Sequence, residues 1–466
     1  METIDLSGVK KIHFIGIGGA SMSGLAHFML DRGVSVSGTD SCLTESTDLL
    51  ASAGANVYSP HDGSLIALHN PDLVVYTIAV PADNPELRAA QARGIPIMER
   101  AVFLGLYMKE YAKGIAVAGT HGKTTTTSMI SSILFENNLD PSIHIGGSLP
   151  LIGGNTKIGG SEFFVTEACE YHDSFLQLRP WIAVVLNVEY DHVDYFKTFA
   201  QFKQSFSEFV GLVPAHGFVV VCADDPDALA IAQHATCPVL TYGAENKKAT
   251  WQAHQITYTA DGNPCFDLVH DGAMICRITL GTVGIHNVRN ALAAIAVATA
   301  CGLSPQDCVA PLLHFAGANR RFEYKGMMGA VKIVDDYAHH PTEIRTTLTA
   351  ARASLTGKKS AGRLIVAFQP HTYTRTRELM ADFANAFQEA DLVVLADIYA
   401  SRETNPGDVH STMLADAINQ VSGNCVYQDS FEAIAAWIRQ EAKPGDLVIT
   451  MGAGDIFKVA DLLLKS

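Results

Sequence analysis

The chain has 466 residues, a formal net charge of −15 and 48% hydrophobic residues. This length corresponds to about three domains, and the acidic balance argues against a nucleic acid or an anionic membrane as the main partner. The nine cysteines are scattered without a Cys-x-x-Cys pair, so neither a disulfide framework nor a zinc site is expected. The longest near-continuous apolar run, Ala291–Cys301, is too short to span a bilayer. The first residues do not resemble a signal peptide, and we expect a cytoplasmic protein.

The first predicted α/β segment opens with a strand over Lys11–Gly16. A glycine-rich turn follows this strand, and a helix opens within the turn. Further strands are predicted over Val34–Ser37 and Leu73–Tyr76, with helical stretches between them. This alternation predicts a Rossmann-like N-terminal domain over residues 1–107.

A second α/β segment begins near Gly114. Its predicted strands are Ile115–Ala118, Phe163–Thr166, Trp181–Leu186, Phe218–Cys222 and Pro238–Thr241. A β-rich stretch over 250–280 contains Asp261-Gly262, which predicts a hairpin turn. Its predicted helices are Thr126–Leu134, His286–Cys301 and Pro305–Leu313. These elements predict a P-loop-like central domain over residues 108–318.

The third segment starts near Asn319 and alternates again. Its predicted elements are the strand Val331–Val334, the helix Thr342–Ser354, the strand Leu364–Phe368, the helix Arg375–Ala390 and the strand Leu392–Leu395. Strands that alternate with helices form parallel sheets covered on both faces. We therefore predict an α/β protein of three domains, each with a mainly parallel sheet flanked by helices. The C-terminal domain, over 319–466, is predicted to be Rossmann-like.

The run Gly119–Thr125, which reads G-T-H-G-K-T-T, carries the strongest chemical signal in the sequence. A strand, a glycine-rich turn, Lys-Thr and a helix form the arrangement of a nucleoside-triphosphate cradle. Its small residues let backbone N–H groups approach phosphates, and the helix N-terminus favours negative charge. Lys123 is expected to reach the β- and γ-phosphates, and the Thr124 hydroxyl is expected to hold Mg²⁺. Val117 stands where a full Walker A pattern has its first glycine, so the short motif by itself is a weak signal. The strand before the motif and the helix after it strengthen the prediction of phosphate binding.

The turn after the first strand, Gly16–Gly24, predicts a second phosphate-binding loop. Its glycines at positions 16, 18 and 19 permit a tight turn against a diphosphate. Asp40 follows the second strand, where an acidic side chain could bind ribose hydroxyls. NAD(P) is a competing ligand, but Ser21 stands where the third glycine of G-x-G-x-x-G would be. A Rossmann-like turn without any ligand is the structural alternative.

Acidic residues and a histidine follow two strands of the second segment. Glu167 follows one strand, where a carboxylate beside a phosphate loop is well placed for Mg²⁺. Asp191, His192 and Asp194 follow the next strand at the same expected sheet edge. A histidine between acids at a strand end has a metal-binding or catalytic role about as often as a structural one.

Other polar residues have both a structural and a functional interpretation. Asn287, at the start of an alanine-rich helix, is either a helix cap or a polar edge for a nucleotide base. Arg321, at the junction of the second and third segments, is either a surface residue or a γ-phosphate ligand. The stretches Asp335–Glu343 and Phe368–Arg377 follow strands of the third segment, where open α/β sheets bind ligands. Within the second stretch, Arg375 could hold a carboxylate through two parallel hydrogen bonds.

In their order along the chain, these motifs resemble those of the Mur ligase family over essentially the whole sequence. The resemblance rests on His13–Gly19, Gly119–Thr125, Glu167–Glu170, Asn187–Asp194, His286-Asn287, Arg320–Phe322, Asp335–Glu343 and Phe368–Thr376. Several motifs in one order are specific, whereas each alone would be a modest signal. The first loop and the Phe-Gln-Pro-His stretch point to the alanine-adding branch of the family.

The resemblance implies a UDP-sugar-binding N-terminal domain, a central ATP-binding domain and a C-terminal amino-acid-binding domain. The implied ATP ligands are Gly119, Thr120, His121, Gly122, Lys123, Thr124, Thr125, His286, Asn287, Asn290, Arg321, Asp336 and Tyr337. The implied ligands of Mg²⁺, with Mn²⁺ as an alternative ion, are Thr124, Glu167 and His192. The implied substrate-binding residues are Gly16, Gly18, Gly19, Asp40, Thr77, His340, His371 and Arg375. The implied catalytic residues are Lys123, His192 and Arg321.

The implied reaction is an ATP-dependent ligation in peptidoglycan precursor synthesis, and hence in cell-wall biogenesis, cell shape and cell division. The lactyl carboxylate of UDP-N-acetylmuramate attacks the γ-phosphate, and the amine of L-alanine then attacks the acyl phosphate. Mg²⁺, Lys123 and Arg321 would screen the approaching anions. His192 or Asp191 would accept the amine proton, and closure of the third domain would exclude water.

Three alternatives remain open at the level of sequence. The nearest is a recycling ligase that adds a preformed peptide to the same sugar, and the others are a nucleotide-binding regulator and an NAD-dependent dehydrogenase. Thr372 stands where some relatives carry arginine, which leaves part of the alanine carboxylate contact open. Lys203 lies near the position of a carbamylated lysine in certain members but not in a matching motif. Small-molecule substrates are the expected partners of a monomer or homodimer.

Overall fold

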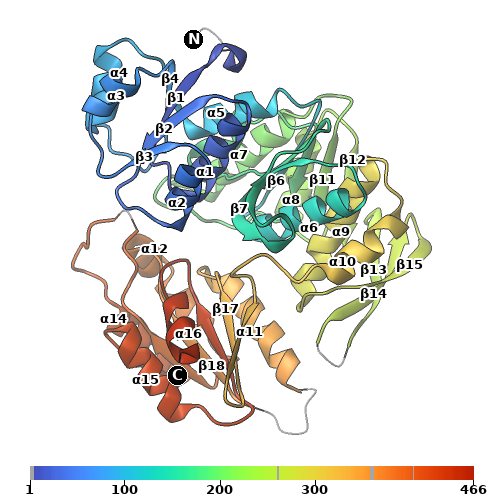
Figure 1. Cartoon of the computed structure of the whole chain (residues 1–466). Coiled ribbons are helices and arrows are strands. Elements are labelled where there is room, and N and C mark those ends of the chain that lie inside the picture. The colour runs from blue at the N-terminus through green and yellow to red at the C-terminus, as the bar shows by residue number, and fades with distance from the viewer. Residues whose placement is uncertain (1–4, 260–261, 357–361, 402, 466) are drawn as a thin grey trace. The chain divides into compact units, whose positions relative to one another are not determined.

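The computed structural model describes residues 5–259, 262–356, 362–401 and 403–465. The chain forms three α/β domains, each with one sheet and its helices (Figure 1). The residues group into two compact units. The first contains Met1–Glu189, Phe199–Thr241 and Ala293–Leu303, and the second contains Tyr190–Thr198, Tyr242–Leu292 and Ser304–Ser466. Within the described ranges, no helix has both the length and the apolar character needed to cross a membrane.

The N-terminal sheet has five parallel strands in the order β3-β2-β1-β4-β5. Its strands are β1 Lys11–Ile15, β2 Ser35–Thr39, β3 Asn56–Tyr58, β4 Leu73–Tyr76 and β5 Ile97–Glu99. Its helices are η1 Leu6–Gly8, α1 Ala20–Asp31, α2 Glu45–Ser52, α3 Ser64–His69, α4 Pro85–Ala92 and α5 Arg100–Met108. The strand order reverses between β1 and β4, and such a switch point is where open α/β sheets bind ligands. The predicted Rossmann-like arrangement is therefore confirmed.

The central parallel sheet of the first unit has the order β11-β10-β6-β9-β7-β8, in which only the β7–β8 pair is antiparallel. Its strands are β6 Lys113–Ala118, β7 Ser142–Leu149, β8 Gly154–Lys157, β9 Phe163–Glu167, β10 Ile182–Val185 and β11 Phe218–Cys222. Its helices are α6 Lys123–Glu136, η2 Pro150–Ile152, η3 Tyr171–Gln177, α7 Phe199–Gly211, α8 Pro226–Ile231 and η4 Ala232–His234. Residues 115–118 of β6 are fully buried, which explains the continuous apolar run before the phosphate loop.

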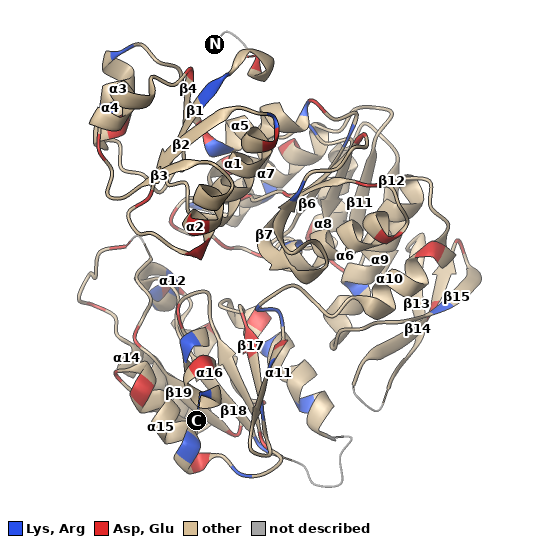
Figure 2. Cartoon of the chain, viewed as in Figure 1, with Lys and Arg blue, Asp and Glu red and all other residues tan. Residues whose placement is uncertain are grey.

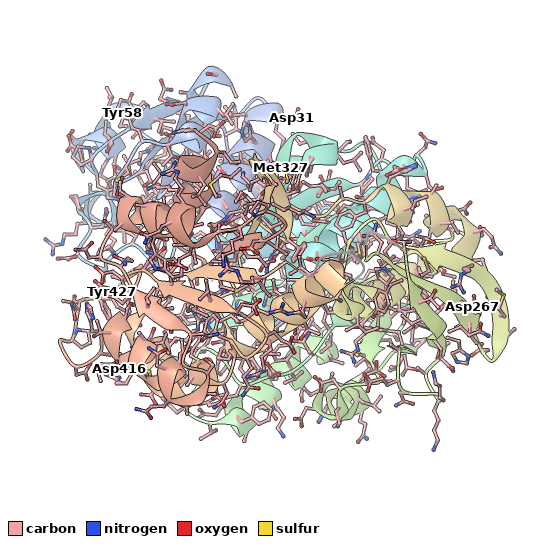
Figure 3. All side chains as sticks on the ribbon, turned by 90° about the horizontal axis from the view of Figure 1, so that it is seen from below. Asp31, Tyr58, Asp267, Met327, Asp416 and Tyr427 are labelled. Carbon is pink, nitrogen blue, oxygen red and sulfur yellow. The ribbon has the colours of Figure 1, made fainter. Side chains whose placement is uncertain are left out.

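The predicted β-rich stretch is confirmed as strands β13 Trp251–Tyr258, β14 Pro264–His270 and β15 Ala273–Thr279, which form an antiparallel meander after β12 Val239–Gly243. Asp267, labelled in Figure 3, faces Arg277 across β14 and β15, and their side chains pair at 2.6 Å. Such cross-strand pairs stabilise an antiparallel sheet. The predicted Asp261-Gly262 turn lies partly outside the described residues. The helices that follow are α9 Ile285–Ala300, η5 Pro305–Cys308 and α10 Val309–His314.

The C-terminal sheet has the order β16-β17-β21-β18-β19-β20, with β16 as its antiparallel edge strand. Its strands are β16 Glu323–Met328, β17 Val331–Asp336, β18 Leu364–Phe368, β19 Leu392–Leu395, β20 Cys425–Tyr427 and β21 Leu447–Met451. Its helices are α11 Pro341–Thr356, α12 Tyr373–Glu378, α13 Met380–Ala384, α14 Ser411–Val421, α15 Phe431–Glu441 and α16 Phe457–Leu464. Two apolar cores, one containing Leu348 and Leu414 and the other Ile434 and Val459, involve alternate residues of these strands. Helices therefore cover both faces of the sheet, as predicted.

The predicted continuous helix over Arg375–Ala390 is wrong. The chain instead forms α12 and α13, separated by Leu379, and α13 ends at Ala384. Leu379 and Met380 both pack against the apolar core on this face of the sheet. The break lets two consecutive apolar side chains reach that core, which a regular helix would direct about 100° apart. Figure 2 shows residues of both charge signs on α15 and α16.

Candidate functional site

The phosphate loop joins β6 to α6 at the carboxyl end of β6. Gly119 has φ +141° and Gly122 has φ +84°, a region of backbone conformation that favours glycine. A side chain at position 119 would also place its Cβ 2.9 Å from the Cβ of Leu186. Helix α6 begins at Lys123, three residues before the predicted Thr126. The first turn of α6 therefore directs backbone N–H groups toward the loop, as an anion site requires.

Asn187 holds the phosphate loop in place, a role that the sequence did not predict. Its Oδ1 accepts the backbone N–H of His121 at 2.8 Å, and its Nδ2 donates to the carbonyl of His121 at 3.0 Å. The hydroxyl of Thr120 bonds to both backbone groups of Glu189, at 2.8 and 2.9 Å. The ring of His121 lies 2.8 Å from a carboxylate oxygen of Glu189. These contacts fix the loop from the segment that follows strand β10.

The ammonium of Lys123 is held by its own loop and by a buried carboxylate. Nζ lies 2.5 Å from the carbonyl oxygen of Gly119, 3.1 Å from that of Thr120 and 3.0 Å from Oε1 of Glu170. Burial opposes the charge, but the carboxylate of Glu170 outweighs burial and raises the pKa of Lys123 above its ordinary value. Lys123 is therefore a cation at neutral pH, as a phosphate-binding lysine must be.

Glu167 and Thr124 border two adjacent glycines of β7, Glu167 beside Gly146 and Thr124 beside Gly147. Glu167 ends β9, opposite Val117 of β6, and its Oε1 accepts the N–H of Gly146 at 2.7 Å. A Cβ added to Gly146 would lie 3.2 Å from this oxygen, and one added to Gly147 would lie 3.0 Å from Cγ2 of Thr124. The pair offers a carboxylate and a hydroxyl, which are oxygen ligands suited to Mg²⁺.

The structure brings together five of the residues predicted to bind the UDP-sugar. Gly16 has φ +83°, and a Cβ there would lie 2.7 Å from Cγ2 of Thr77. The N–H of Gly18 donates to Oδ2 of Asp40 at 2.9 Å. Oδ1 of Asp40 accepts the N–H of Cys42 at 3.3 Å, so this carboxylate organises the loop on both sides. Gly19, the residue before α1, completes the turn.

A cavity of about 270 Å³ lies within the first unit. Its walls come from the N-terminal and central domains and include Ser21, Arg100, Lys123, His144, Gly146 and Glu167. Lys123 and Glu167 were predicted from sequence, whereas Arg100 and His144 were not. No local sequence pattern indicates a site at Arg100 or His144. Arg100 is a single residue at the start of α5, and His144 is a single residue within β7.

In the second unit, three polar residues predicted to lie near adenine cluster at the start of α9. Burial lowers the pKa of His286 to about 4, so its ring is neutral, and its Nδ1 has no hydrogen-bond partner among the described residues. Nδ2 of Asn287 donates to the carbonyl of Val283 at 2.8 Å, and Nδ2 of Asn290 donates to Oδ1 of Asn287 at 3.0 Å. The side-chain amide of Asn287 is therefore engaged by Val283 and Asn290. Nδ1 of His286 is the polar atom of this cluster that could still bind a ligand.

The two arginines at the junction have different surroundings in the second unit. Arg320 is engaged by Asp335 at 2.8 Å and by the carbonyls of Gly454 and Gly452 at 3.1 and 2.7 Å. Arg321 instead forms a long ion pair with Glu343 at 3.9 Å, lies 5.2 Å from the ring centre of Tyr337, and its side chain is 25% exposed. Arg321 is therefore held less tightly than Arg320, which makes it the better candidate to contact an anion.

Asp336 ends β17 and supports the backbone of the same loop. Its carboxylate accepts the N–H groups of Phe322 at 2.7 Å and Ala338 at 2.8 Å. Burial raises the pKa of Asp336 to about 6, although the guanidinium of Arg321 opposes this shift. Asp336 thus shapes the turn that carries Arg321 and Tyr337.

Arg375 binds a carboxylate of the second unit itself. Its Nη2 lies 3.3 and 3.4 Å from the two oxygens of Asp191, and its Nη1 lies 3.1 Å from Nδ1 of His371. Burial opposes the charge of Asp191, but Arg375, His192 and His340 outweigh it and hold the pKa of Asp191 well below its usual range. A carboxylate with such a low pKa is a weak base.

Lys203 lies on α7, and its Nζ forms an ion pair with Asp227 at 3.0 Å. Thr372, next to His371, has φ +66°, a rare value for a β-branched residue. Strained backbone of this kind concentrates at functional sites.

The fold and these clusters define a three-domain α/β protein with a P-loop-like glycine turn before α6 and a Rossmann-like glycine turn before α1. Three family profiles match consecutive parts of the chain. Residues 11–112 match the Mur ligase family, catalytic domain; residues 117–298 match the Mur ligase middle domain; and residues 320–454 match the Mur ligase, glutamate ligase domain. The chain belongs to the Mur ligase family.

Individual relatives narrow the comparison. A UDP-N-acetylmuramate–L-alanine ligase of Acetivibrio thermocellus is 47% identical over 465 residues, which cover 100% of this chain and 98% of the relative. The crystal structure of the UDP-N-acetylmuramate-alanine ligase MurC of Thermotoga maritima superimposes with a TM-score of 0.83 at 27% identity, with 98% of each chain covered. A murein peptide ligase of Psychrobacter arcticus superimposes with a TM-score of 0.75 at 27% identity and the same coverage.

Proposed function

We propose that this chain is an ATP-dependent ligase that joins the lactyl carboxylate of UDP-N-acetylmuramate to the amine of L-alanine. The observation that carries the proposal is full-length identity of 47% to a relative of that name. The phosphate loop, with Lys123, Thr124 and Glu167 arranged around it, supplies the chemical basis. An L-alanine ligase also superimposes more closely than a peptide ligase of equal identity, with TM-scores of 0.83 and 0.75.

In the first unit, we assign the nucleotide phosphates to Gly119, Gly122, Lys123 and neighbouring N–H groups of α6. Thr124 and Glu167 are the proposed Mg²⁺ ligands of this unit, and His192, on the second unit, is assigned to a second metal position. Bound there, Mg²⁺ would supply charge neutralisation of the phosphates. We assign the UDP-sugar to the turn of Gly16, Gly18 and Gly19, with Asp40 and Thr77 as its supports.

In the second unit, His286, Asn287 and Asn290 are the proposed adenine contacts, and Asp336 and Tyr337 position Arg321 for the γ-phosphate. His340, His371 and Arg375 are assigned to the amino acid. The carboxylate attack places two anions side by side, so the cations Lys123 and Arg321 lower the barrier by stabilising the transferring phosphoryl group. The amine must then lose a proton to attack the acyl phosphate, and His192 or Asp191 is the proposed acceptor; His192 can take this role only while its ring does not coordinate a metal.

Three further assignments accompany this proposal. The domain boundaries are 1–107, 108–318 and 319–466, in line with the three matched ranges. The location is the cytoplasm, where ATP and nucleotide sugars are available. The functional assembly is a monomer or homodimer.

Product analysis tests the proposal and separates it from the recycling ligase. The purified chain is incubated with ATP, Mg²⁺, UDP-N-acetylmuramate and either L-alanine or the tripeptide, and phosphate release and product mass are measured. Release with L-alanine, and its loss in Lys123→Ala, is expected. Turnover with the tripeptide alone would assign the recycling activity instead.

A further inference from the structure

Tyr399 is a partly exposed aromatic residue beside one of the groups assigned to the amino acid. Its side chain is 36% exposed, and its ring stacks on the imidazole of His371. The ring centres lie 5.6 Å apart, and the planes are inclined by 21°. The two residues follow neighbouring parallel strands of the C-terminal sheet, His371 after β18 and Tyr399 after β19. Offset stacking at this separation is a favourable arrangement of two aromatic rings.

Backbone hydrogen bonds and a glycine hold Tyr399 in place. Its N–H donates to the carbonyl of Pro370 at 2.8 Å, and its carbonyl accepts the N–H of Thr372 at 2.9 Å. These two bonds flank His371 and form a short parallel bridge between the two segments. A Cβ added to Gly454 would lie 2.8 Å from Cγ of Tyr399, so the ring packs closely against the backbone of this glycine. Because the backbone bonds do not involve the ring, a substitution at position 399 removes the stacking and keeps the bridge.

The hydrogen bond between His371 and Arg375 defines the tautomer of the imidazole. Nη1 of Arg375 lies 3.1 Å from Nδ1 of His371. A guanidinium has no acceptor atom, so Nη1 donates and Nδ1 accepts. The imidazole can accept at Nδ1 only in its neutral form with the proton on Nε2. The orientation of this ring therefore decides whether Arg375 keeps the bond, since a rotated imidazole would direct Nδ1 elsewhere.

We propose that Tyr399 is a positioning residue of the amino-acid site, an inference that rests on the proposed function. Its ring holds the imidazole of His371 in the plane in which Nδ1 meets Arg375. His339 also contacts this imidazole, with ring centres 5.6 Å apart, but the planes are inclined by 64°. Such a contact restrains one edge of the imidazole, whereas stacking restrains its tilt. Tyr399 thus acts on the amino acid through His371 and Arg375 and needs no contact with the substrate.

The effect of Tyr399 should fall on the carboxylate of the amino acid and not on its side chain. Two residues hold the guanidinium of Arg375, His371 at Nη1 and Asp191 at Nη2. Without the bond to His371, the guanidinium is held at one end and can rotate. An arginine recognises a carboxylate through parallel N–H groups in a fixed plane, so a loosely held guanidinium binds it less well. Every α-amino acid carries this carboxylate, so the loss should be the same for glycine as for L-alanine.

Steady-state kinetics of full-length Tyr399→Ala tests the inference. The KM for L-alanine should rise about 3- to 10-fold, which corresponds to the loss of one aromatic stack. The apparent binding constant of glycine, measured by competition with L-alanine, should rise by the same factor. The value of kcat and the KM values for ATP and UDP-N-acetylmuramate should stay within about twofold. Tyr399→Phe keeps the ring and should restore the KM for L-alanine.

Matched variants separate this role from folding. Tyr427→Ala removes another tyrosine–histidine contact of the same domain, with His410 at 5.2 Å, and should leave the KM for L-alanine unchanged. Tyr399→Leu keeps an apolar side chain without an aromatic face, so it should raise this KM and gives a second measurement if Tyr399→Ala unfolds.

Three results would each overturn the inference. They are an unchanged KM for L-alanine in Tyr399→Ala, a rise shared by ATP and the nucleotide sugar, and a change for L-alanine that is absent for glycine. The second result would make the ring structural, and the third would place it on the side chain of the substrate. Wild-type chain that forms no alanine product would instead refute the proposed function alone.

Discussion

Replacement of Asn187 by alanine should loosen the phosphate loop and weaken ATP binding. The change removes two hydrogen bonds to His121, at 2.8 and 3.0 Å, and leaves the backbone bond from Thr120 to the carbonyl of residue 187 intact. Each bond contributes about 0.5–1.5 kcal/mol net, and the partial exposure of the loop lets water replace part of the loss. We expect a loss of about 1–2 kcal/mol, which corresponds to a roughly 5- to 30-fold higher KM for ATP.

Asn187→Asp provides a sharper comparison than alanine alone. Its first oxygen would still accept the N–H of His121, but its second would face the carbonyl oxygen of His121 where the amide now donates. The aspartate variant should therefore lose more loop stability than the alanine variant. Asn385→Ala, which removes an exposed bond to the carbonyl of Ala381, is the matched control and should stay within about 0.5 kcal/mol.

Two measurements follow these variants: phosphate release as a function of ATP concentration, and urea unfolding of the first unit. An unchanged KM for ATP in Asn187→Ala would refute the idea that this side chain orders the loop. An aspartate variant more stable than the alanine variant would contradict the assigned direction of the amide.

Three further predictions concern the metal, a buried histidine and a strained residue. Glu167→Gln keeps an acceptor for the N–H of Gly146, so the variant should fold normally, judged by its unfolding midpoint, yet release phosphate at least 100-fold more slowly at saturating Mg²⁺ because the charged ligand is lost. The pKa of His286 is about 4 when folded and near 6.5 when unfolded, so its contribution to stability is complete above about pH 6.5 and declines as the pH falls toward 4. His286→Phe should show a shallower loss of stability between these pH values in urea titrations, and an identical slope would contradict the assigned burial effect. Thr372→Gly should raise the unfolding free energy by about 1 kcal/mol, because glycine adopts φ +66° without strain. A clear destabilisation in urea unfolding would show that the hydrogen bond from the N–H of Arg375 to the Thr372 hydroxyl, at 3.4 Å, contributes more than the strain costs.

Much of the fold follows from local sequence pattern. Alternating apolar runs and helical stretches predicted three α/β segments because buried parallel strands are apolar throughout and covering helices have a polar face. The helix over 375–390 failed because Leu379 and Met380 both pack on the core, a preference set by the facing sheet and not by local propensity.

The sequence by itself determined the phosphate cradle and the diphosphate turn, because a strand, a glycine turn and a helix start are adjacent in the chain and their backbone geometry is local. Tertiary structure alone decided which distant groups complete them. Glu170 reaches Lys123 across 47 residues, Asn187 reaches His121 across 66, and Arg100 reaches Ser21 across 79. These pairs meet because strand order brings remote segments to one sheet edge, and strand order depends on non-local hydrogen bonding and packing that no short window of residues contains.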